Sequence, residues 1–390
     1  MKSNHLARLA ALWLVATMGA SAATAIKAAP PTVTLTRVPQ NGVQPQTAVD
    51  TNGTVHLVFL AGKERASDVY YATRRTADRE FSKPVRVNHQ AGGAVAAGTI
   101  RGAQLALGGD GGVHVLWNGS RSPDGGHEHT PLWYSRREPG GRFEPERNLM
   151  TRTRMLDGGG SIAADARGNV YAVWHAAPAA EPPGKGGGES ARGVYVAASG
   201  DGGRTFAREE RISSLPGTCG CCGLKSFTDT DGRLHTLYRG ASTLTQRDML
   251  HLIGTRPGES ATANVSAWRI GTCPMSSAAF VQTPSGVVGA WETENRVSFA
   301  RLGTGGKAAP KPVSMPGAAR QRHPALATNA GGWVLVVWSE NTGWQRGGEV
   351  AWQVFDKDGA AGPSGRKPGV PVWGFAAAHA LPQGGFEILY

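Results

Sequence analysis

Long hydrophobic runs are scarce in this sequence of 390 residues. The first run, residues 9–18, follows two basic residues and precedes small ones. This pattern predicts an export signal peptide over residues 1–25, with cleavage near Ala22 or Ala25. The run is too short to cross a bilayer and no later segment qualifies, so we expect no membrane span. No cysteine stands directly after the run, which argues against a lipid-anchored form. We expect residues 26–390 to be periplasmic or secreted.

Helix-forming patterns are also nearly absent after this segment, and no basic helix or nucleic-acid-binding motif occurs. We therefore expect no nucleic-acid partner, although the formal net charge is +12 and loses only two positive charges with the signal peptide. Such a charge suits a well-solvated exported protein, or one that binds an anionic glycan or small-molecule ligand. Cysteine is scarce too, and all four cysteines lie in two short motifs.

The most abundant feature is a repeated phrase, in which a glycine is followed five or six residues later by an aromatic residue, with aliphatic residues between them. Seven copies occur, at residues 53–59, 111–117, 168–174, 232–238, 286–291, 332–338 and 384–390. The closing aromatic residues are 47 to 64 residues apart. A strand that recurs with a period near fifty indicates a β-propeller, in which each unit forms one blade of four short strands. The tryptophans that close four copies are predicted core residues: Trp117, Trp174, Trp291 and Trp338.

The predicted fold class is therefore all-β, a β-propeller of four-stranded blades. The repeat count predicts seven blades, with six as the alternative. The seventh unit supplies only two strands, within residues 375–390, and Val33–Val38 reads like an orphan fourth strand. Pairing of these segments would close the ring and remove open strand edges. Because a propeller is one ring, we expect residues 26–390 to form a single domain, and we expect a monomer.

The third unit ends in a turn sequence, Ser199-Gly-Asp-Gly-Gly-Arg-Thr-Phe206, that resembles the Asp-box of sialidases and their relatives. The matching residues are Ser199, Asp201, Gly203, Thr205 and Phe206. Asp201 and Thr205 can hydrogen-bond within such a hairpin turn, and its glycines take unusual backbone angles. The resemblance implies a sialidase-like propeller, with this box on its outside and without a chemical role.

The resemblance stops at the sialidase active site, which carries an Arg-Ile-Pro motif, two further arginines, a Tyr–Glu nucleophile pair and an aspartic acid. Here Arg37-Val-Pro39 precedes the first inner strand, and that strand begins without an arginine. No Tyr–Glu pair can be assigned, and Glu292 and Glu294 are interpreted as loop charges. We therefore expect a protein that does not hydrolyse glycosides, with an exo-sialidase-type hydrolase as the alternative.

The cysteine motifs carry a closer resemblance, to a group of bacterial exported sialidase-like proteins. These proteins share Cys-x-Cys-Cys before one blade, Arg-Asp on its third strand and Cys-Pro before the next blade. Here the motifs are Cys219-Gly-Cys-Cys222, Arg247-Asp248 and Cys273-Pro274. By the repeat, both cysteine motifs precede the channel-lining strands of blades four and five. We therefore expect Cys219, Cys221, Cys222 and Cys273 to cluster at one mouth of the channel.

Three interpretations of the cysteines remain open. Two disulfides would suit an oxidising compartment, although the adjacent Cys221 and Cys222 lie too close in the chain for a relaxed bond to each other. The thiols would also suit a soft metal, and copper is favoured because zinc sites usually space paired cysteines by two or more residues. The third interpretation is thiol–disulfide exchange, in which Arg247 lowers a thiol pKa.

Further polar residues are expected at the same mouth. Arg247 and Asp248 form either a surface ion pair or a supporting layer, in which Asp248 orients a ligand and Arg247 offsets thiolate charge. His323 and Arg101 take the corresponding positions in blades six and two and are candidate ligand-binding residues. The leading function is that of a binding or metal-handling protein, with a metal-handling protein as a possible partner. A disulfide-stapled interaction scaffold is the second alternative.

Overall fold

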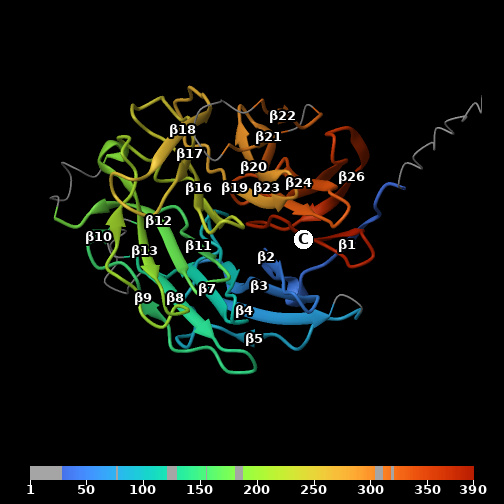
Figure 1. Cartoon of the computed structure of the whole chain (residues 1–390), viewed down its shortest axis with the longest axis horizontal. Coiled ribbons are helices and arrows are strands. Elements are labelled where there is room, and N and C mark those ends of the chain that lie inside the picture. The colour runs from blue at the N-terminus through green and yellow to red at the C-terminus, as the bar shows by residue number, and fades with distance from the viewer. Residues whose placement is uncertain are drawn as a thin grey trace, which may run out of the picture. The chain divides into compact units, whose positions relative to one another are not determined.

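The computed structural model describes residues 29–75, 78–120, 130–154, 156–180, 188–303, 311–317 and 320–390. The predicted signal peptide, residues 1–25, lies outside the described residues. Residues Pro31–Tyr390 form a seven-bladed β-propeller of mainly four-stranded blades (Figure 1). In the part of the chain that is described, no helix is long and apolar enough to cross a membrane.

Six blades are antiparallel sheets whose strands follow one another along the chain. Blades one and two contain β2 (Val43–Val49), β3 (Thr54–Lys63), β4 (Ala66–Arg75), β5 (Val85–Arg86), β6 (Gln104–Leu107), β7 (Val113–Asn118), β8 (Leu132–Arg137) and β9 (Arg147–Asn148). Blades three and four contain β10 (Thr153–Arg154), β11 (Ser161–Ala164), β12 (Val170–Pro178), β13 (Gly193–Ser199), β14 (Glu210–Arg211), β15 (Lys225–Thr228), β16 (Leu234–Arg239), β17 (Met249–Ile253) and β18 (Ala261–Ser266). Blades five and six contain β19 (Ala278–Thr283), β20 (Gly286–Thr293), β21 (Arg296–Arg301), β22 (Val313–Ser314), β23 (Gln321–Thr328), β24 (Val334–Glu340), β25 (Gly348–Phe355) and β26 (Ala361–Val370). Two short 3-10 helices, η1 (Pro39–Asn41) and η3 (Glu189–Ala191), lie in connections.

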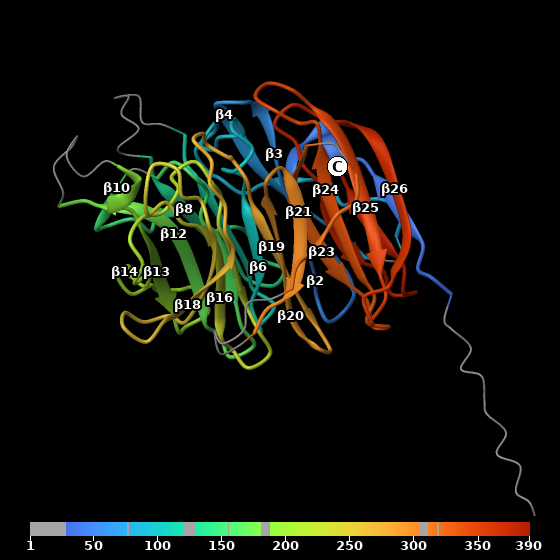
Figure 2. The same ribbon diagram turned by 90° about the horizontal axis from the view of Figure 1, so that it is seen from above.

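The innermost strands enclose the channel. They contact one another in the order β2, β6, β11, β15, β19, β23 and β27 (Ala377–Ala380), and β27 contacts β2 again. In Figure 1 the chain runs around this ring until its red C-terminal end meets the blue β1 (Val33–Thr36). Figure 2 shows from the side that the strands run between two faces, where the connecting loops lie. The prediction of seven blades is confirmed.

Strand β1 closes the ring, as predicted for residues 33–38. It pairs with β28 (Phe386–Leu389), so that Val33 lies opposite Phe386 and Thr36 opposite Leu389. The predicted fourth-strand position is wrong, because β1 lies directly beside β28 in a three-stranded blade with the order β1-β28-β27. The pairing is parallel, which is possible because no hairpin joins the two strands.

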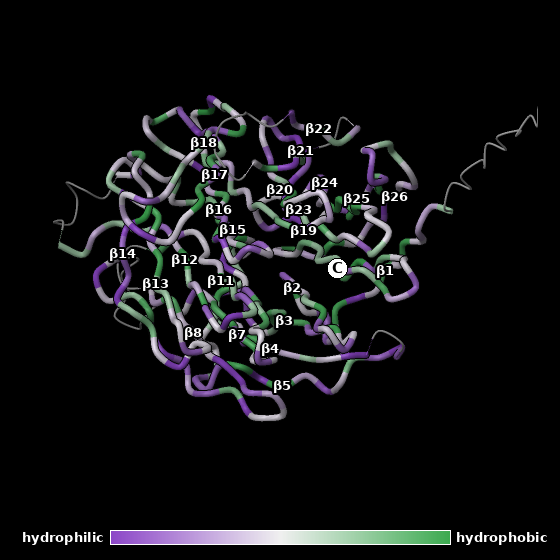
Figure 3. The backbone as a smooth tube through the Cα atoms, in the orientation of Figure 1, coloured by the Kyte–Doolittle hydropathy of each residue, from purple (hydrophilic) through white to green (hydrophobic). Residues whose placement is uncertain are grey.

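Burial falls from the middle of each blade to the rim. Strands β7 and β24 are buried along their whole length, whereas β5 and β22 are exposed. Figure 3 shows the same gradient, with hydrophobic stretches along the inner strands and hydrophilic ones at the periphery. The four repeat tryptophans lie in the core as predicted, each 3% exposed or less. Removal of such a side chain from water contributes about 1.5–3 kcal/mol to stability.

A buried carboxylate also joins the two ends of the ring. Glu387 of β28 pairs with Arg74 of β4, and its Oε2 lies 3.0 Å from Nε2 of His379 on β27. The hydroxyl of Thr36, on β1, donates to Glu387 Oε1 at 2.5 Å. Burial raises the pKa of Glu387, but the hydrogen bonds from His379, Arg74 and Thr36 outweigh it and lower the pKa to about 2. One ionised side chain therefore connects blades one and seven.

Candidate functional site

A tight loop between β14 and β15 carries three cysteines. The Cys219 N–H donates to the Arg239 carbonyl at 2.9 Å, and the Cys222 N–H donates to the Cys219 carbonyl at 3.5 Å. Sγ of Cys219 lies 3.4 Å from Sγ of Cys221 and 3.5 Å from Sγ of Cys222. The three sulfurs all lie within 4.8 Å of one another. Cys219 and Cys222 are buried and Cys221 is half-buried, so the three thiols form one cluster in which Cys221 is the most accessible.

The fourth cysteine comes from the next blade. Cys273 is exposed in the loop between β18 and β19. Its thiol contacts that of Cys221, and this interaction lowers the pKa of Cys273. The loops that precede neighbouring inner strands meet at the same end of the channel. The structure therefore brings together all four cysteines that the repeat placed there.

The pKa values of the clustered thiols are shifted in different directions. Burial raises the pKa of Cys222, but hydrogen bonds from Cys219 and Cys221 and the positive charge of Arg239 outweigh it, and the pKa falls well below its usual value. Hydrogen bonds to Cys219, Cys222 and Cys273 raise the pKa of Cys221. The lowered pKa favours the thiolate form of Cys222, and a thiolate is the form that binds metals and attacks disulfides.

Arg239, which the sequence reasoning missed, lies beside the Cys222 sulfur. Its buried guanidinium donates to the carbonyls of Arg247, at 2.8 Å, and Glu292. It also donates to Oγ of Ser276 at 3.1 Å, and this hydroxyl lies 3.8 Å from Sγ of Cys222. Arg239 directly follows Tyr238, the closing aromatic residue of its repeat, so it ends a buried strand. An arginine directly after the closing aromatic residue of a repeat was the sequence signal that could have identified it.

A loop to which the sequence assigned no function supplies an acidic neighbour. Glu189, in η3, accepts the Gly220 N–H at 3.0 Å through Oε1 and pairs with Arg247 through Oε2 at 2.5 Å. Arg192 directly follows η3 and is buried; burial lowers its pKa, while nearby acidic groups and the thiols of the cluster partly offset this effect. The connection between β12 and β13 therefore holds the cysteine loop in place.

Arg247 pairs with Glu189 rather than with Asp248, which differs from the expected surface ion pair. The Asp248 carboxylate accepts the side-chain amides of Gln246, at 2.6 Å, and Asn264, at 2.7 Å, and the Trp268 N–H at 3.0 Å. Adjacent residues of an extended chain point in opposite directions, so only one of the two can face the thiols. Arg247 faces the cysteine loop, and Asp248 stabilises the outer edge of blade four.

Arg101 and His323 lie at the starts of their inner strands, as the repeat placed them. Arg101 pairs with the Asp157 carboxylate and donates to the carbonyls of Asp157 and Ala97, both at 2.8 Å. Its described contacts therefore fasten blade two to blade three. His323 is buried, and its Nδ1 lies 3.3 Å from the Ser277 hydroxyl. Burial is the main cause that lowers its pKa to about 3, so its imidazole is neutral near pH 7.

Glu292 was interpreted as a loop charge, and this interpretation is wrong. It lies on β20 directly after the core residue Trp291, with 0% of its surface exposed, whereas Glu294 lies in the exposed turn. Among the described residues neither carboxylate oxygen has a hydrogen-bond donor, and the nearest cation is Arg322, whose Nε lies 3.8 Å from Oε1. Burial raises the pKa of Glu292 to about 7, although Arg322 and Arg239 act in the opposite direction.

The channel below the cysteines holds a lysine. A cavity of 130 Å³ is lined by residues of all seven inner strands or the segments directly before them. Lys225 of β15 points into it and donates through Nζ to the side-chain oxygens of Gln46, at 3.2 Å, and Gln104, at 2.8 Å. Burial lowers the Lys225 pKa to about 8. Two carboxamide oxygens thus solvate this amine in place of water.

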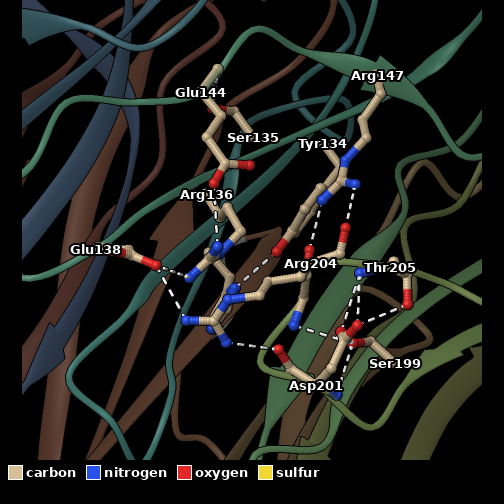
Figure 4. A network of polar contacts seen from close by, with 12 residues as sticks. Tyr134, Ser135, Arg136, Glu138, Glu144, Arg147, Ser199, Asp201, Arg204 and Thr205 are labelled. Carbon is tan, nitrogen blue, oxygen red and sulfur yellow. Dashed lines mark hydrogen bonds and ion pairs between the residues drawn. The ribbon is translucent and has the colours of Figure 1, made fainter.

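The Asp-box, in the turn after β13 of blade three, lies beside Tyr134, Arg136 and Arg147 of blade two (Figure 4). Asp201 accepts the Thr205 N–H at 2.9 Å and the Thr205 hydroxyl at 2.6 Å, and the Ser199 hydroxyl donates to it at 2.7 Å. These hydrogen bonds hold the pKa of Asp201 well below its usual range, and those from Thr205 have the largest effect. Gly203 has a φ of 76°, and Phe206 packs edge-on against Tyr134 with ring centroids 4.8 Å apart.

The box is fastened to blade two by Arg147, so Arg147→Met should weaken that junction. Arg147 donates to the carbonyls of Gly203 and Arg204 and lies over the Tyr134 ring. We expect the free energy of unfolding to fall by about 1–2 kcal/mol, because charge-assisted hydrogen bonds contribute about this much. Urea unfolding measures the change. Arg208→Met, at an exposed position near the box, is the control and should leave stability nearly unchanged.

No protein-family model matches this chain, and no curated protein sequence matches it. Solved structures resemble it. An alpha-L-arabinanase of Penicillium chrysogenum, complexed with arabinobiose, has a TM-score of 0.53 and 12% identity over 83% of this chain and 95% of its own. Trypanosoma rangeli sialidase has a TM-score of 0.52 and 12% identity, and the match covers 77% of this chain and 52% of the sialidase. An alpha-l-arabinofuranosidase of Fusarium graminearum has a TM-score of 0.50 and 10% identity, and the match covers 76% of this chain and 88% of the arabinofuranosidase. Identities this low show the fold alone, a sialidase-like propeller.

Proposed function

We propose that this chain is an exported protein that binds a soft metal ion, copper as Cu(I), at the cysteine cluster of its channel mouth. The observation that carries the proposal is that three thiol sulfurs lie within 4.8 Å of one another. Metal–sulfur bonds of about 2.3 Å hold the ligands of one ion roughly 3.8–4.0 Å apart. Sulfurs at 3.4 and 3.5 Å are therefore close to the spacing that a bound ion needs.

The surroundings of the thiols support a soft ion with low charge. Thiolates select Cu(I) over hard cations, and several thiolates around one Cu(I) leave a net negative charge. Arg239, Arg192 and Arg247 supply positive charge beside the cluster and offset it. Cys273 is the exposed member of the set, and it offers a thiol through which a metal-handling partner could deliver or accept the ion.

Cys222→Ser tests the proposal directly. We expect the reduced chain to bind one Cu(I) tightly in competition with a chromophoric chelator, and the variant to bind at least about 100-fold more weakly, since even outer-shell partners of a metal cost 10–100-fold when removed. Cys273→Ser is the comparison, with a smaller loss because this residue lies at the edge of the cluster. Equal affinities of wild type and Cys222→Ser would contradict metal binding at the cluster.

A thiol count separates the metal site from the disulfide-stapled scaffold. In denaturant with a chelator and no reductant, all four thiols of the metal-binding form should react with a thiol reagent, and none should react in the disulfide-stapled scaffold. A count of two would favour one disulfide beside a reactive pair, which is the arrangement that thiol–disulfide exchange needs.

A glycoside hydrolase is the second candidate, and Glu292 is the observation that favours it. A carboxyl group with a pKa near 7 suits general acid catalysis. Its side chain is fully buried, however, and so cannot contact a substrate in this conformation. Turnover of a fluorogenic sialoside or arabinoside that is abolished by Glu292→Gln would favour hydrolysis over metal binding.

A further inference from the structure

Bulky residues in the left-handed backbone region gather where the inner strands begin. Thr99, Met275, His323 and Trp373 have φ values of 65°, 51°, 50° and 62°. Such a conformation costs a residue with a Cβ atom about 1–3 kcal/mol and is found mainly where the surrounding structure imposes it, often at functional sites. Blades two, five, six and seven each contribute one of these residues, and all four line the same cavity.

The cavity is small. Its volume is 20 Å³, and its lining also includes Arg322 and Trp344. One water molecule needs about 10–15 Å³, so there is room for a single water-sized occupant such as an ion. A sugar ring does not fit. The size of the cavity therefore separates this site from the glycan-binding function of structural neighbours such as the arabinanase.

Two side chains of the lining, those of Met275 and His323, carry soft or neutral donor atoms. Met275 lines the cavity with a side chain that carries a thioether sulfur, and its loop also carries Cys273. His323 uses Nδ1 for the Ser277 hydroxyl, which leaves Nε2 as the nitrogen for a ligand. Trp344 is 58% exposed and packs edge-on against Trp373, with ring centroids 4.7 Å apart. Indole faces attract cations.

We propose that Met275 and His323 form a second site for a soft monovalent ion, covered by Trp344 and Trp373 and adjacent to the cysteine cluster. Thioether sulfur and imidazole nitrogen both suit copper, and thioether selects Cu(I). The inference rests on the proposed function for the identity of the ion. Because Met275 lies two residues from Cys273, the site would hold an ion at the surface before the thiols take it over.

The charge of Arg322 restricts what can bind. This guanidinium lines the cavity and lies 3.8 Å from the Glu292 carboxylate. It repels any cation, so binding depends on ligand bonds to sulfur and nitrogen, which alkali and alkaline-earth ions form poorly. The site should therefore be selective for soft ions and weaker than the cluster of thiolates.

Titration with Ag(I), a redox-inert analogue of Cu(I), tests the second site on the reduced full-length chain in chloride-free nitrate buffer. Wild type should bind two Ag(I) ions, the first at the thiols. The second ion should shift the NMR signal of the Met275 methyl group in protein labelled with methyl-¹³C-methionine, and it should quench tryptophan fluorescence. Met275→Leu should weaken the second ion at least about tenfold and leave the first unchanged. Met315→Leu, 1% exposed in the core, is the matched control and should still bind both.

A chain with serine at all four cysteine positions separates the two proposals. It should bind one Ag(I) and still show the Met275 shift; if it fails to fold, wild type preloaded with one Ag(I) takes its place. Three results would overturn the second site. The Met275 signal could stay unmoved, Met275→Leu could bind the second Ag(I) as tightly as wild type, or nitrate or chloride alone could cause the Met275 shift. Binding at Met275 without binding at the thiols would leave this site standing and overturn the proposed function of the cluster.

Discussion

Arg74→Met is expected to lower the free energy of unfolding by about 3–5 kcal/mol, because removal of one partner of a buried ion pair leaves the other charge uncompensated. The side chains of Arg74 and Glu387 are each only 5% exposed. Arg74 also donates from Nη1 to Glu387 Oε1 at 3.2 Å. Since Glu387 joins β1, β27 and β28 to blade one, the loss falls on the closure of the ring. Equilibrium urea unfolding measures it.

The same pair predicts an acid-sensitive closure. The Glu387 pKa is about 2 in the folded chain, against an ordinary value of 4.5. A lowered acid pKa stabilises the fold at pH values above 4.5, and this contribution, about 3 kcal/mol, is lost as the pH falls from 4.5 to 2. The advantage of wild type over Glu387→Gln should therefore shrink across this range. Asp358→Asn, in an exposed pair with Lys357, is the control and should change stability by less than about 1 kcal/mol. A pH-independent difference between wild type and Glu387→Gln would contradict the proposed role of this carboxylate.

Glu292→Gln should act with the opposite sign. The Glu292 pKa is raised to about 7 by burial, so the unfolded chain releases this proton near pH 4.5 while the folded chain keeps it. A raised acid pKa destabilises the fold progressively as the pH rises from 4.5 to 7. The stability of the variant relative to wild type should therefore increase by about 3 kcal/mol between pH 4 and pH 8. Urea unfolding at several pH values measures this change.

The control for this prediction is Glu294→Gln, two residues further along. Its side chain lies in the exposed turn after β20, so its replacement should leave the pH dependence of stability like that of wild type. If Glu292→Gln also follows the wild-type curve, Glu292 is ionised in the folded chain, and Arg322 and Arg239 compensate its charge more fully than the 3.8 Å contact suggests.

Much of the architecture was predictable because a blade is a local structure. Each unit is a series of short hairpins, and its glycines and closing aromatic residues recur along the chain with a period near fifty. Strand alternation and turn formation depend on residues close in sequence, so they can be predicted from the sequence alone. The seven copies of the repeat, the core tryptophans and the ends of the inner strands that carry the cysteine motifs all follow from this local pattern.

The chemistry around the cysteines could be predicted only in part. The repeat placed the four thiols at one mouth, but their charged neighbours come from loops without periodicity. Glu189 approaches from the connection between β12 and β13, which carries no repeat signal, and Glu292 looked like a loop charge until the register of β20 buried it.

The sequence by itself determined the all-β repeat with its seven copies and the meeting of the two cysteine motifs, because these depend on local pattern and on the symmetry of a ring, whereas the structure chose seven blades over six. The tertiary structure decided that β1 takes the third position in its blade, that Arg247 faces Glu189, and that Arg239 lies beside Cys222. The first of these features joins residues 352 positions apart, Arg247 and Glu189 are 58 positions apart, and Arg239 approaches Cys222 from the strand after the next one. Such contacts are set by how loops pack across the ring, and no periodic signal in the chain records them.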